Sequence, residues 1–233
     1  MFVVIEWVDG AGKKTQTWLL ADKLRDMWKA VDTISFPSYG QWSATFVEKF
    51  LNGEFGRPHT VDPYVSATFY AADRFGQKPI IEKKIAVYDY LVSDRYSMSS
   101  FIHRGAIFLE EWDENAMRDF FGWLYDLEFQ KARLPLPDKI FFLSMGIKNI
   151  EANLQKKEQE RLLQDSYVTK EQWGWLDSAE KDLEHQKYSL LVGKEILPTY
   201  FDNYIVIDCE DESGRLLTPQ AIHQKILAKV LEE

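Results

Sequence analysis

Short apolar runs alternate with longer amphipathic segments along most of the chain. Five runs have the length and composition of buried strands: Phe2–Ile5, Val31–Phe36, Val87–Ser93, Lys139–Ser144 and Tyr204–Ile207. Apolar residues at helical spacing predict helices over Thr15–Lys29, Phe46–Leu51, Glu114–Phe129 and Pro219–Leu231, and another that begins at Asp62-Pro63. This alternation is typical of βαβ units, so it predicts an α/β fold with about five parallel strands covered by helices on both faces.

The segment from Lys148 to Glu184 departs from this alternation. It is rich in charged residues and contains no clear strand. Two interpretations remain open: a pair of solvated helices, or a lid over an active site that spans about residues 148–176. Because no repeat or Pro/Gly/Ser-rich linker interrupts the chain, residues 1–233 are predicted to form a single domain.

The composition excludes several classes of function. Among 233 residues there are 28 Lys and Arg against 37 Asp and Glu, a formal net charge of −9. That charge argues against a protein that coats nucleic acid or an anionic membrane. No run reaches the about 18 apolar residues of a membrane span, and the first residues lack the basic start of a signal peptide. A single cysteine, Cys209, leaves no intrachain disulfide. We therefore expect a cytoplasmic protein without nucleic-acid or membrane partners.

The first predicted strand leads directly into a glycine-containing segment, Trp7-Val8-Asp9-Gly10-Ala11-Gly12-Lys13-Lys14-Thr15. A phosphate-binding loop has Gly, four residues, Gly-Lys and then Ser or Thr, and it surrounds phosphates with backbone N–H groups and a helix N-terminus. Gly12-Lys13 fits this pattern, but Trp7 replaces the first glycine and Lys14 replaces the hydroxyl residue that usually binds magnesium. An ordinary strand-to-helix turn remains an alternative on this segment alone.

Six sequence words occur in order along the chain. They are Ile5-Glu6-x-Val8-Asp9-Gly10-Ala11-Gly12-Lys13-x-Thr15-Gln16, Phe36-Pro37-x-Tyr39-Gly40, Leu51-Asn52-Gly53-Glu54-Phe55-Gly56, Tyr70-Ala71-x-Asp73-Arg74, Asp94-Arg95-Tyr96 and Leu134-Pro135-x-Pro137-Asp138. In this order they resemble the thymidylate kinase family, well over about residues 1–145 and loosely beyond. The resemblance implies a three-layer P-loop kinase fold with a helical lid. It also implies ATP-dependent phosphorylation of dTMP to dTDP, with Mg²⁺ as cofactor, in a homodimer.

The resemblance assigns the phosphoryl donor to the glycine-containing segment. It implies that ATP is bound by Asp9, Gly10, Ala11, Gly12, Lys13, Lys14 and Thr15, with Lys13 on the β- and γ-phosphates. Asp9 would repel phosphate unless it had a partner, and the implied partners are the 3′-hydroxyl of the monophosphate and Mg²⁺. Asp94 follows the third strand, where a carboxylate can hold Mg²⁺, and Arg95 can bridge the acceptor phosphate and the transferred phosphoryl group. A surface ion pair is the alternative for these last two residues.

The acceptor pocket is implied by a second set of residues. Tyr70 and Arg74 are four residues apart, so they share one helix face, where an aromatic plate and a guanidinium suit a nucleotide base. A buried Tyr with an exposed Arg is the alternative. Phe36 would form a wall of the same pocket, and Tyr39 would donate its hydroxyl to the acceptor phosphate. Ser100 and His103 are further substrate-binding candidates. They depart from the residues usual in the family, as does Ser38, and leave the base preference less secure than the reaction type.

The charged segment is expected to supply positive charge to the transition state, since phosphoryl transfer depends mainly on positioning and electrostatics. Family members without an arginine in the phosphate loop usually place it in the lid. Arg161 is therefore the catalytic candidate, and Lys14, Lys156 and Lys157 could share the task. Glu180 matches a carboxylate that helps to organise the acceptor sugar.

Two rival functions remain open on the sequence. One is a kinase of another pyrimidine monophosphate, and the other is a degenerate nucleotide-binding protein without transfer activity, suggested by Trp7 and Lys14. The chain contains 8 Trp against only 12 Gly, where average usage of about 7% would give roughly 16 Gly. Trp7 and Trp28 occupy positions where glycine is expected, whereas Trp123 fits an amphipathic helix. One hypothesis is that some of these codons are UGA, read as glycine in the source organism.

Overall fold

A computed structural model describes residues 1–8, 15–56, 60–164 and 183–232, without the side chains of residues 157–164. Its centre is a five-stranded parallel sheet in the order β2-β3-β1-β4-β5. The strands are β1 (Phe2–Trp7), β2 (Val31–Ser35), β3 (Tyr90–Asp94), β4 (Lys139–Ser144) and β5 (Tyr204–Asp208). The predicted α/β class and parallel sheet are confirmed.

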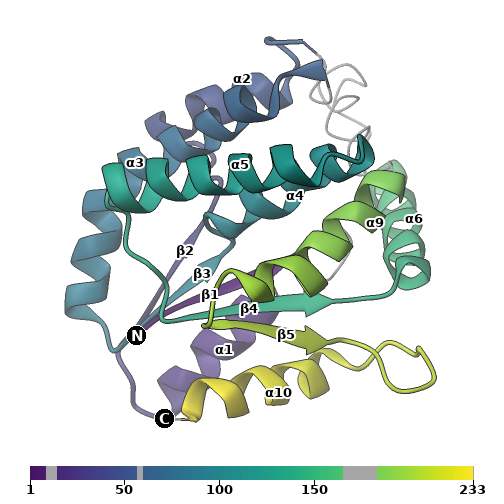
Figure 1. The fold of residues 1–233 in the computed structure, drawn as a ribbon. Helices are drawn as coiled ribbons and strands as arrows, with labels where there is room; N and C mark the ends of the chain where they lie inside the picture. The colour runs from purple at the N-terminus through teal and green to yellow at the C-terminus, as the bar shows by residue number, and fades with distance from the viewer. Residues whose placement is uncertain (9–14, 57–59, 165–182, 233) are drawn as a thin grey trace.

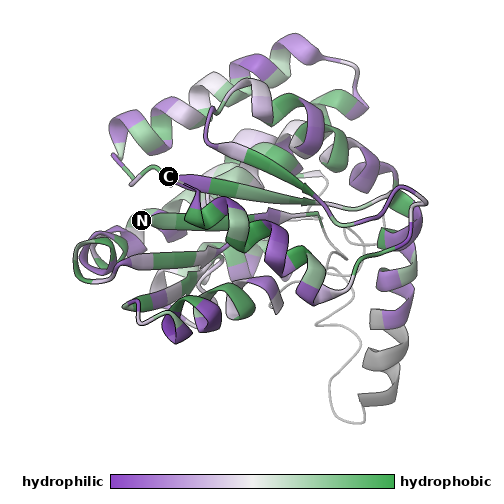
Figure 2. Ribbon diagram, turned by 90° about the horizontal axis from the view of Figure 1, so that it is seen from below, coloured by the Kyte–Doolittle hydropathy of each residue, from purple (hydrophilic) through white to green (hydrophobic). Residues whose placement is uncertain are grey.

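Helices cover both faces of the sheet (Figure 1). On one side lie α1 (Thr15–Asp26) and α10 (Pro219–Leu231), which pack against each other. On the other side lie α2 (Thr45–Leu51), α3 (Pro63–Val87), α4 (Met98–Glu110), α5 (Glu114–Tyr125) and α9 (Leu183–Leu191), and α6 (Ile147–Gln164) follows β4. Every residue of β1 is buried, and Figure 2 shows the strands mainly in the colour of hydrophobic residues. The sheet is therefore the middle of three layers.

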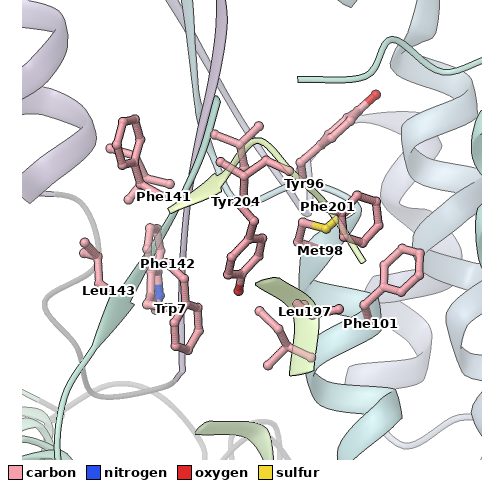
Figure 3. Close-up of a cluster of buried hydrophobic side chains, with 14 of the residues drawn as sticks. Trp7, Tyr96, Met98, Phe101, Phe141, Phe142, Leu143, Leu197, Phe201 and Tyr204 are labelled. Atoms are coloured by element: carbon pink, nitrogen blue, oxygen red, sulfur yellow. The ribbon is translucent and has the colours of Figure 1, made fainter. Parts of the chain in front are cut away.

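Aromatic side chains fill the layer between the sheet and helix α4 (Figure 3). Phe101 on α4 meets Phe201 edge to face, with ring centroids 5.5 Å apart. The ring centroid of Phe142 on β4 lies 6.1 Å from that of Tyr204. A Cβ on Gly193 would lie 2.4 Å from the Phe142 ring, so this glycine allows the segment after α9 to approach the sheet. Phe120 and Phe121 of α5 are also buried in the core.

Several predicted boundaries need correction. α3 continues to Val87, so the third strand begins at Tyr90, because an apolar run fits the end of a buried helix as well as a strand. The first helix ends at Asp26, not Lys29, and α4 was not predicted. Eight of its 13 residues are buried.

The predicted helix over Glu114–Phe129 also needs correction. α5 ends at Tyr125, and the π-helical segment η3 (Asp126–Lys131) follows it. The predicted start of α3 is confirmed, because the Asp62 carboxylate accepts hydrogen bonds from the N–H groups of Tyr64 and Val65. Within the described ranges, no helix is long and apolar enough to cross a membrane.

Candidate functional site

A cavity of about 740 Å³ opens where β1, β2 and β3 end. Trp7, Ser35 and Asp94, the last residues of these three strands, all line it. Parallel strands bring their carboxyl ends to one edge of the sheet, which is where α/β proteins bind ligands. Seven residues predicted to bind the acceptor line this one cavity: Phe36, Tyr39, Tyr70, Arg74, Arg95, Ser100 and His103.

The loops after β2 and β3 are fixed to neighbouring strands. Phe36 N donates to Asp94 O (2.9 Å), and Arg95 N donates to Ile5 O (3.0 Å). The Phe36–Pro37 peptide bond is cis. The two backbone hydrogen bonds hold the buried Phe36 ring and the half-buried Asp94 and Arg95 at the same edge of the cavity.

Arg95 adopts a backbone conformation that is rare for a residue with a side chain, with φ +64°. Its Nη1 lies 3.1 Å from His103 Nε2 and 3.4 Å from Ser99 Oγ. The guanidinium also lies over the Trp7 ring, 5.1 Å from the ring centroid. A strained residue that is held by several neighbours is typical of functional sites.

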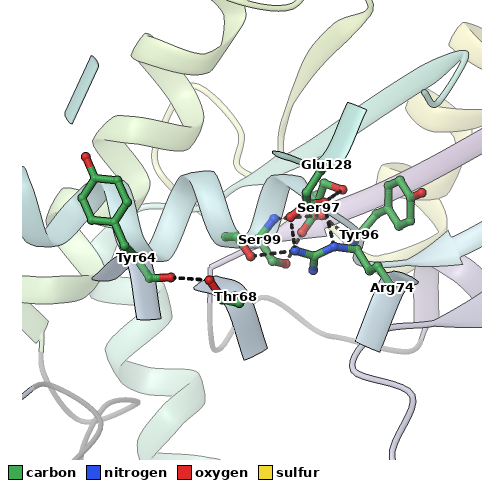
Figure 4. Close-up of polar contacts among 9 residues, drawn as sticks. Tyr64, Thr68, Arg74, Tyr96, Ser97, Ser99 and Glu128 are labelled. Carbon is green, nitrogen blue, oxygen red and sulfur yellow. Dashed lines mark hydrogen bonds and ion pairs between the residues drawn. The ribbon is translucent and has the colours of Figure 1, made fainter. Parts of the chain in front are cut away.

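Arg74 lines the cavity and lies in a buried polar cluster (Figure 4). Its Nε donates to Glu128 Oε2 (2.9 Å), its Nη2 donates to Glu128 Oε1, and Nη2 also lies 3.1 Å from Ser100 Oγ. Ser97 Oγ donates to Glu128 Oε2 (2.5 Å). Arg74 is 1% exposed and Glu128 is 0% exposed, so the alternative of an exposed Arg74 is wrong. Its Nη1 has no hydrogen-bond partner within the described residues, and Arg74 lines the cavity.

The neighbouring residue on α3, Asp73, faces a different partner. Its carboxylate accepts hydrogen bonds from Ser38 N (2.7 Å), Ser38 Oγ and Ser43 Oγ (2.7 Å). Ser38 occupies the position where an arginine is usual in the family that the sequence motifs resemble. Asp73 is therefore held by neutral donors here, and it anchors the loop that carries Phe36 and Tyr39.

Glu6 is buried in β1, among apolar residues. Oε1 accepts from Tyr96 N (2.7 Å) and Ser99 N (3.2 Å), and Oε2 accepts from Ser99 Oγ (2.6 Å). Burial raises the pKa of Glu6 to about 7, although Arg95 and these hydrogen bonds act in the opposite direction. Glu6 therefore links β1 to the start of α4 and titrates near neutral pH.

The charges in the cavity suit an anion that carries a flat ring. Arg74, Arg95 and Arg104 line it together with Phe36 and Tyr70. Guanidinium groups form paired hydrogen bonds with phosphate, and aromatic faces stack on bases. Burial lowers the pKa of Arg104, but a guanidinium remains charged in proteins. The chemistry indicated by the lining is recognition of a nucleotide.

Carboxylates are few at the cavity surface. In the described lining they are Asp73 and Asp94, and the serines engage the carboxylate of Asp73. The described residues contain no group of three His, Cys, Asp or Glu side chains suited to a metal ion. Asp94, at the end of β3, is the other carboxylate of this lining. Mg²⁺ commonly takes one or two carboxylates together with phosphate oxygens and water, so Asp94 has a suitable donor for this ion.

Several predicted residues lie outside the described part of the chain. These are Asp9, Gly10, Ala11, Gly12, Lys13, Lys14 and Glu180. Thr15 is the first residue of α1 and is exposed. Arg161 belongs to α6, but neither its side chain nor that of Lys157 is described. Their predicted roles stay predictions.

Glu6, Glu128 and Arg104 were not among the predicted site residues. The two glutamates have a signal in the sequence that could have found them. Glu6 interrupts an apolar strand, and Glu128 stands four residues after the buried Leu124, on the apolar face of the predicted helix. Charged residues at core positions need partners, so both positions point to buried polar clusters.

Known proteins resemble this chain in sequence. The family model described as thymidylate kinase matches residues 5–182. Thymidylate kinase from Mycobacterium tuberculosis is 30% identical over 219 residues, which cover 93% of this chain and 95% of that protein. Human thymidylate kinase is 29% identical over 145 residues, covering 62% of this chain and 61% of that protein.

A solved structure agrees on the fold. Thymidylate kinase from Candida albicans has a TM-score of 0.66 at 16% identity, covering 98% of this chain and 90% of that one. The P-loop kinase fold and the phosphotransferase class predicted from the motifs are confirmed. The chain belongs to the thymidylate kinase family.

Proposed function

We propose that this protein transfers the γ-phosphoryl group of ATP to dTMP, giving dTDP and ADP. The observation that carries the proposal is the cavity at the strand ends, which gathers Arg74, Arg95, Phe36 and Tyr70. Family membership supports ATP as the donor and dTMP as the acceptor. It does not favour another pyrimidine monophosphate or a protein that binds without transfer.

The acceptor would lie between α3 and the loop after β2. Tyr70 and Phe36 would contact the base, and Arg74 would hydrogen-bond a base oxygen through Nη1, since Glu128 and Ser100 occupy its other donors. Ser100 and His103 would complete the base and sugar contacts. Tyr39 and Arg95 would hold the acceptor phosphate, whose oxygen attacks the γ-phosphorus in line without a protein nucleophile.

The donor would lie on residues Asp9 to Thr15, with Lys13 on its β- and γ-phosphates. Mg²⁺, when bound, would neutralise charge on the phosphate oxygens. Asp94 would hold it, together with Asp9, and Asp9 would also contact the acceptor sugar. Arg161, with help from Lys14, Lys156 and Lys157, would add positive charge in the transition state, and Glu180 would orient the sugar.

We also propose a single catalytic domain over residues 1–233, with a lid at about 148–176, that acts as a cytoplasmic homodimer. A dimer face on α5 would have to use residues other than Phe120 and Phe121, because these two rings are buried within the chain. Light scattering on the purified protein measures its oligomeric state.

ADP production with each nucleoside monophosphate in turn tests the reaction. With Mg²⁺ and ATP, dTMP should give the highest kcat/KM, and EDTA should abolish turnover. Preference for dUMP or dCMP would show a different acceptor. Binding of an ATP analogue without dTMP-dependent ADP release would show a degenerate site.

Two arginine-to-lysine substitutions provide a test of the site and its matched control. Arg95→Lys should reduce kcat strongly, because a lysine lacks the planar paired donors of a guanidinium. The exposed Arg118→Lys on α5 should leave kcat unchanged.

A further inference from the structure

Three helices end with the same pair of backbone hydrogen bonds. The pairs are Trp28 N to Arg25 O with Lys29 N to Leu24 O after α1, Gly53 N to Phe50 O with Glu54 N to Lys49 O after α2, and Trp112 N to Leu109 O with Asp113 N to Phe108 O after α4. The donor–acceptor distances lie between 2.9 and 3.2 Å. This is the Schellman motif, in which the first residue beyond the helix cap takes the left-handed conformation, usually as glycine.

The residue at that position differs among the three helices. Gly53 has φ +79°, Trp28 has φ +60° and Trp112 has φ +57°. Only glycine adopts this conformation routinely, because a Cβ crowds the following carbonyl oxygen. A bulky side chain there is an outlier. Of the four non-glycine residues with positive φ in the described chain, two are tryptophan.

Packing does not explain these two tryptophans. Trp28 is 96% exposed and Trp112 is 85% exposed. Neither ring therefore buries apolar surface to offset the backbone cost, although burial is the usual contribution of an indole. Trp123 provides the contrast: it is half-buried in α5 and contacts the rings of Tyr64 and Phe120.

Trp7 stands at a third position that calls for glycine, for a different reason. It precedes Gly12-Lys13 at the spacing of the first glycine in a phosphate-binding loop. Its indole is 1% exposed, and its Nε1 has no hydrogen-bond partner within the described chain. The ring occupies space beneath the Arg95 guanidinium and lines the cavity. A buried indole usually pairs its N–H.

We propose that positions 7, 28 and 112 are glycine in the protein that the source cell makes, and that the printed tryptophans are UGA codons decoded there as glycine. UGA is a codon whose meaning differs between genetic codes. Two local rules, the Schellman motif and the phosphate loop, point to glycine independently at these sites. The cavity would then gain the volume of the Trp7 indole next to Arg95. The expected gain in cavity volume rests on the proposed function, whereas the assignment of glycine at positions 28 and 112 does not.

The codons of the gene and the mass of the protein test the proposal directly. We expect UGA at positions 7, 28 and 112, and UGG at position 123, where glycine would remove a packed ring. Peptides from protein isolated from the source cells should carry glycine masses at the first three positions and a tryptophan mass at the fourth. UGG at the first three positions, or tryptophan masses there, would overturn the proposal.

Recombinant variants of the printed sequence give a second measurement. Trp28→Gly and Trp112→Gly should each raise the thermal midpoint by about 2–4 °C, the shift expected for a chain of this size when about 1 kcal/mol is gained. The control Trp123→Gly should lower it. A lower midpoint for both Trp28→Gly and Trp112→Gly would contradict the assignment. Trp7→Gly should lower the Kd of an ATP analogue. If the codons and midpoints agree but no variant phosphorylates dTMP, the proposed function fails and the glycine assignment stands.

Discussion

Two carboxylates are buried next to the same cavity, Glu128 and Glu6, and both are 0% exposed. Glu128 forms a two-point ion pair with the Arg74 guanidinium and accepts a third hydrogen bond from Ser97. Glu6 accepts only from two backbone N–H groups and one hydroxyl within the described hydrogen bonds, and Arg95 acts on it through charge alone. One carboxylate has a counter-ion in contact, and the other has neutral donors.

The difference decides what each carboxylate can do. A guanidinium in contact offsets the desolvation of Glu128 and fixes the rotamer of Arg74, so this pair can present a base-reading group in one geometry. Neutral donors do not fully offset the desolvation of Glu6, so its pKa rises to about 7. The site therefore combines a fixed ion pair with a titrating group.

The largest expected effect comes from breaking the ion pair. Glu128→Gln leaves the Arg74 cation buried without a counter-ion, so the free energy of unfolding should fall by about 3–5 kcal/mol. The KM for dTMP should rise as Arg74 loses its fixed position. Urea denaturation and dTMP kinetics measure the two effects. The exposed Glu111→Gln, at the end of α4, is the matched control and should change neither.

A double variant separates stability from recognition. Arg74→Met with Glu128→Leu replaces both charges by apolar groups, which is often neutral or stabilising for a buried pair. We expect it to recover most of the stability lost in Glu128→Gln while dTMP turnover stays low. Recovery of turnover as well would show that Arg74 does not contact the acceptor.

The second prediction concerns pH and Glu6. The pKa of Glu6 is about 7 in the native protein and 4.5 ordinarily, so between pH 4.5 and about pH 7 native Glu6 keeps a proton that the unfolded chain has lost. Stability from this group is therefore greatest below pH 4.5, falls as pH rises to about 7 and is constant above it. The total is about 3 kcal/mol, from 1.36 kcal/mol per pKa unit. Glu6→Gln should remove this slope, so that it exceeds the parent in stability at pH 8 and matches it near pH 4.5.

Urea denaturation across that pH range measures the difference between the two proteins. The exposed Glu195→Gln should follow the parent at every pH. Equal slopes for Glu6→Gln and the parent would mean that Glu6 is ionised throughout and is held as firmly as a paired carboxylate.

The sequence predicted the parts of this comparison that depend on periodicity and motif. Tyr70 and Arg74 follow from helical spacing, and Asp94-Arg95 from its place after an apolar strand. Glu128 could not be placed next to Arg74, because the two are 54 residues apart and meet through tertiary packing. The π-helical turn that carries Glu128 also has no signal in the residue pattern.

The backbone conformation of Arg95 was equally beyond the sequence. Its left-handed φ follows from bonds to β1 and from contacts to His103, none of which is local in sequence. The strand boundaries failed for a simpler reason, since the apolar run that includes Val87 fits a helix end and a strand equally well.

A third carboxylate is of the same type as Glu6, since Asp73 also has only neutral donors, one peptide N–H and two hydroxyls. Asp73→Asn keeps the shape but turns one oxygen into a donor, so that it faces either the Ser38 N–H or hydroxyls that must reorient to accept from it. We expect a loss of about 1–3 kcal/mol in unfolding free energy, the cost of an unsatisfied buried polar group. The KM for dTMP should also rise, because Ser38 anchors the loop that carries Tyr39. The exposed Asp22→Asn on α1 is the control for both measurements.

The smallest expected effect is the removal of a single neutral donor from Glu6. Ser99→Ala deletes the hydroxyl that donates to Oε2 at 2.6 Å, so the ionised form of Glu6 loses about 1 kcal/mol and its pKa rises further. Stability at pH 8 should therefore fall by about that amount, while stability near pH 4.5 changes little. Ser99→Thr keeps the hydroxyl and should restore the parent's pH dependence. If Ser99→Ala instead shifts stability equally at both pH values, the hydroxyl acts through packing and does not select the charge state of Glu6.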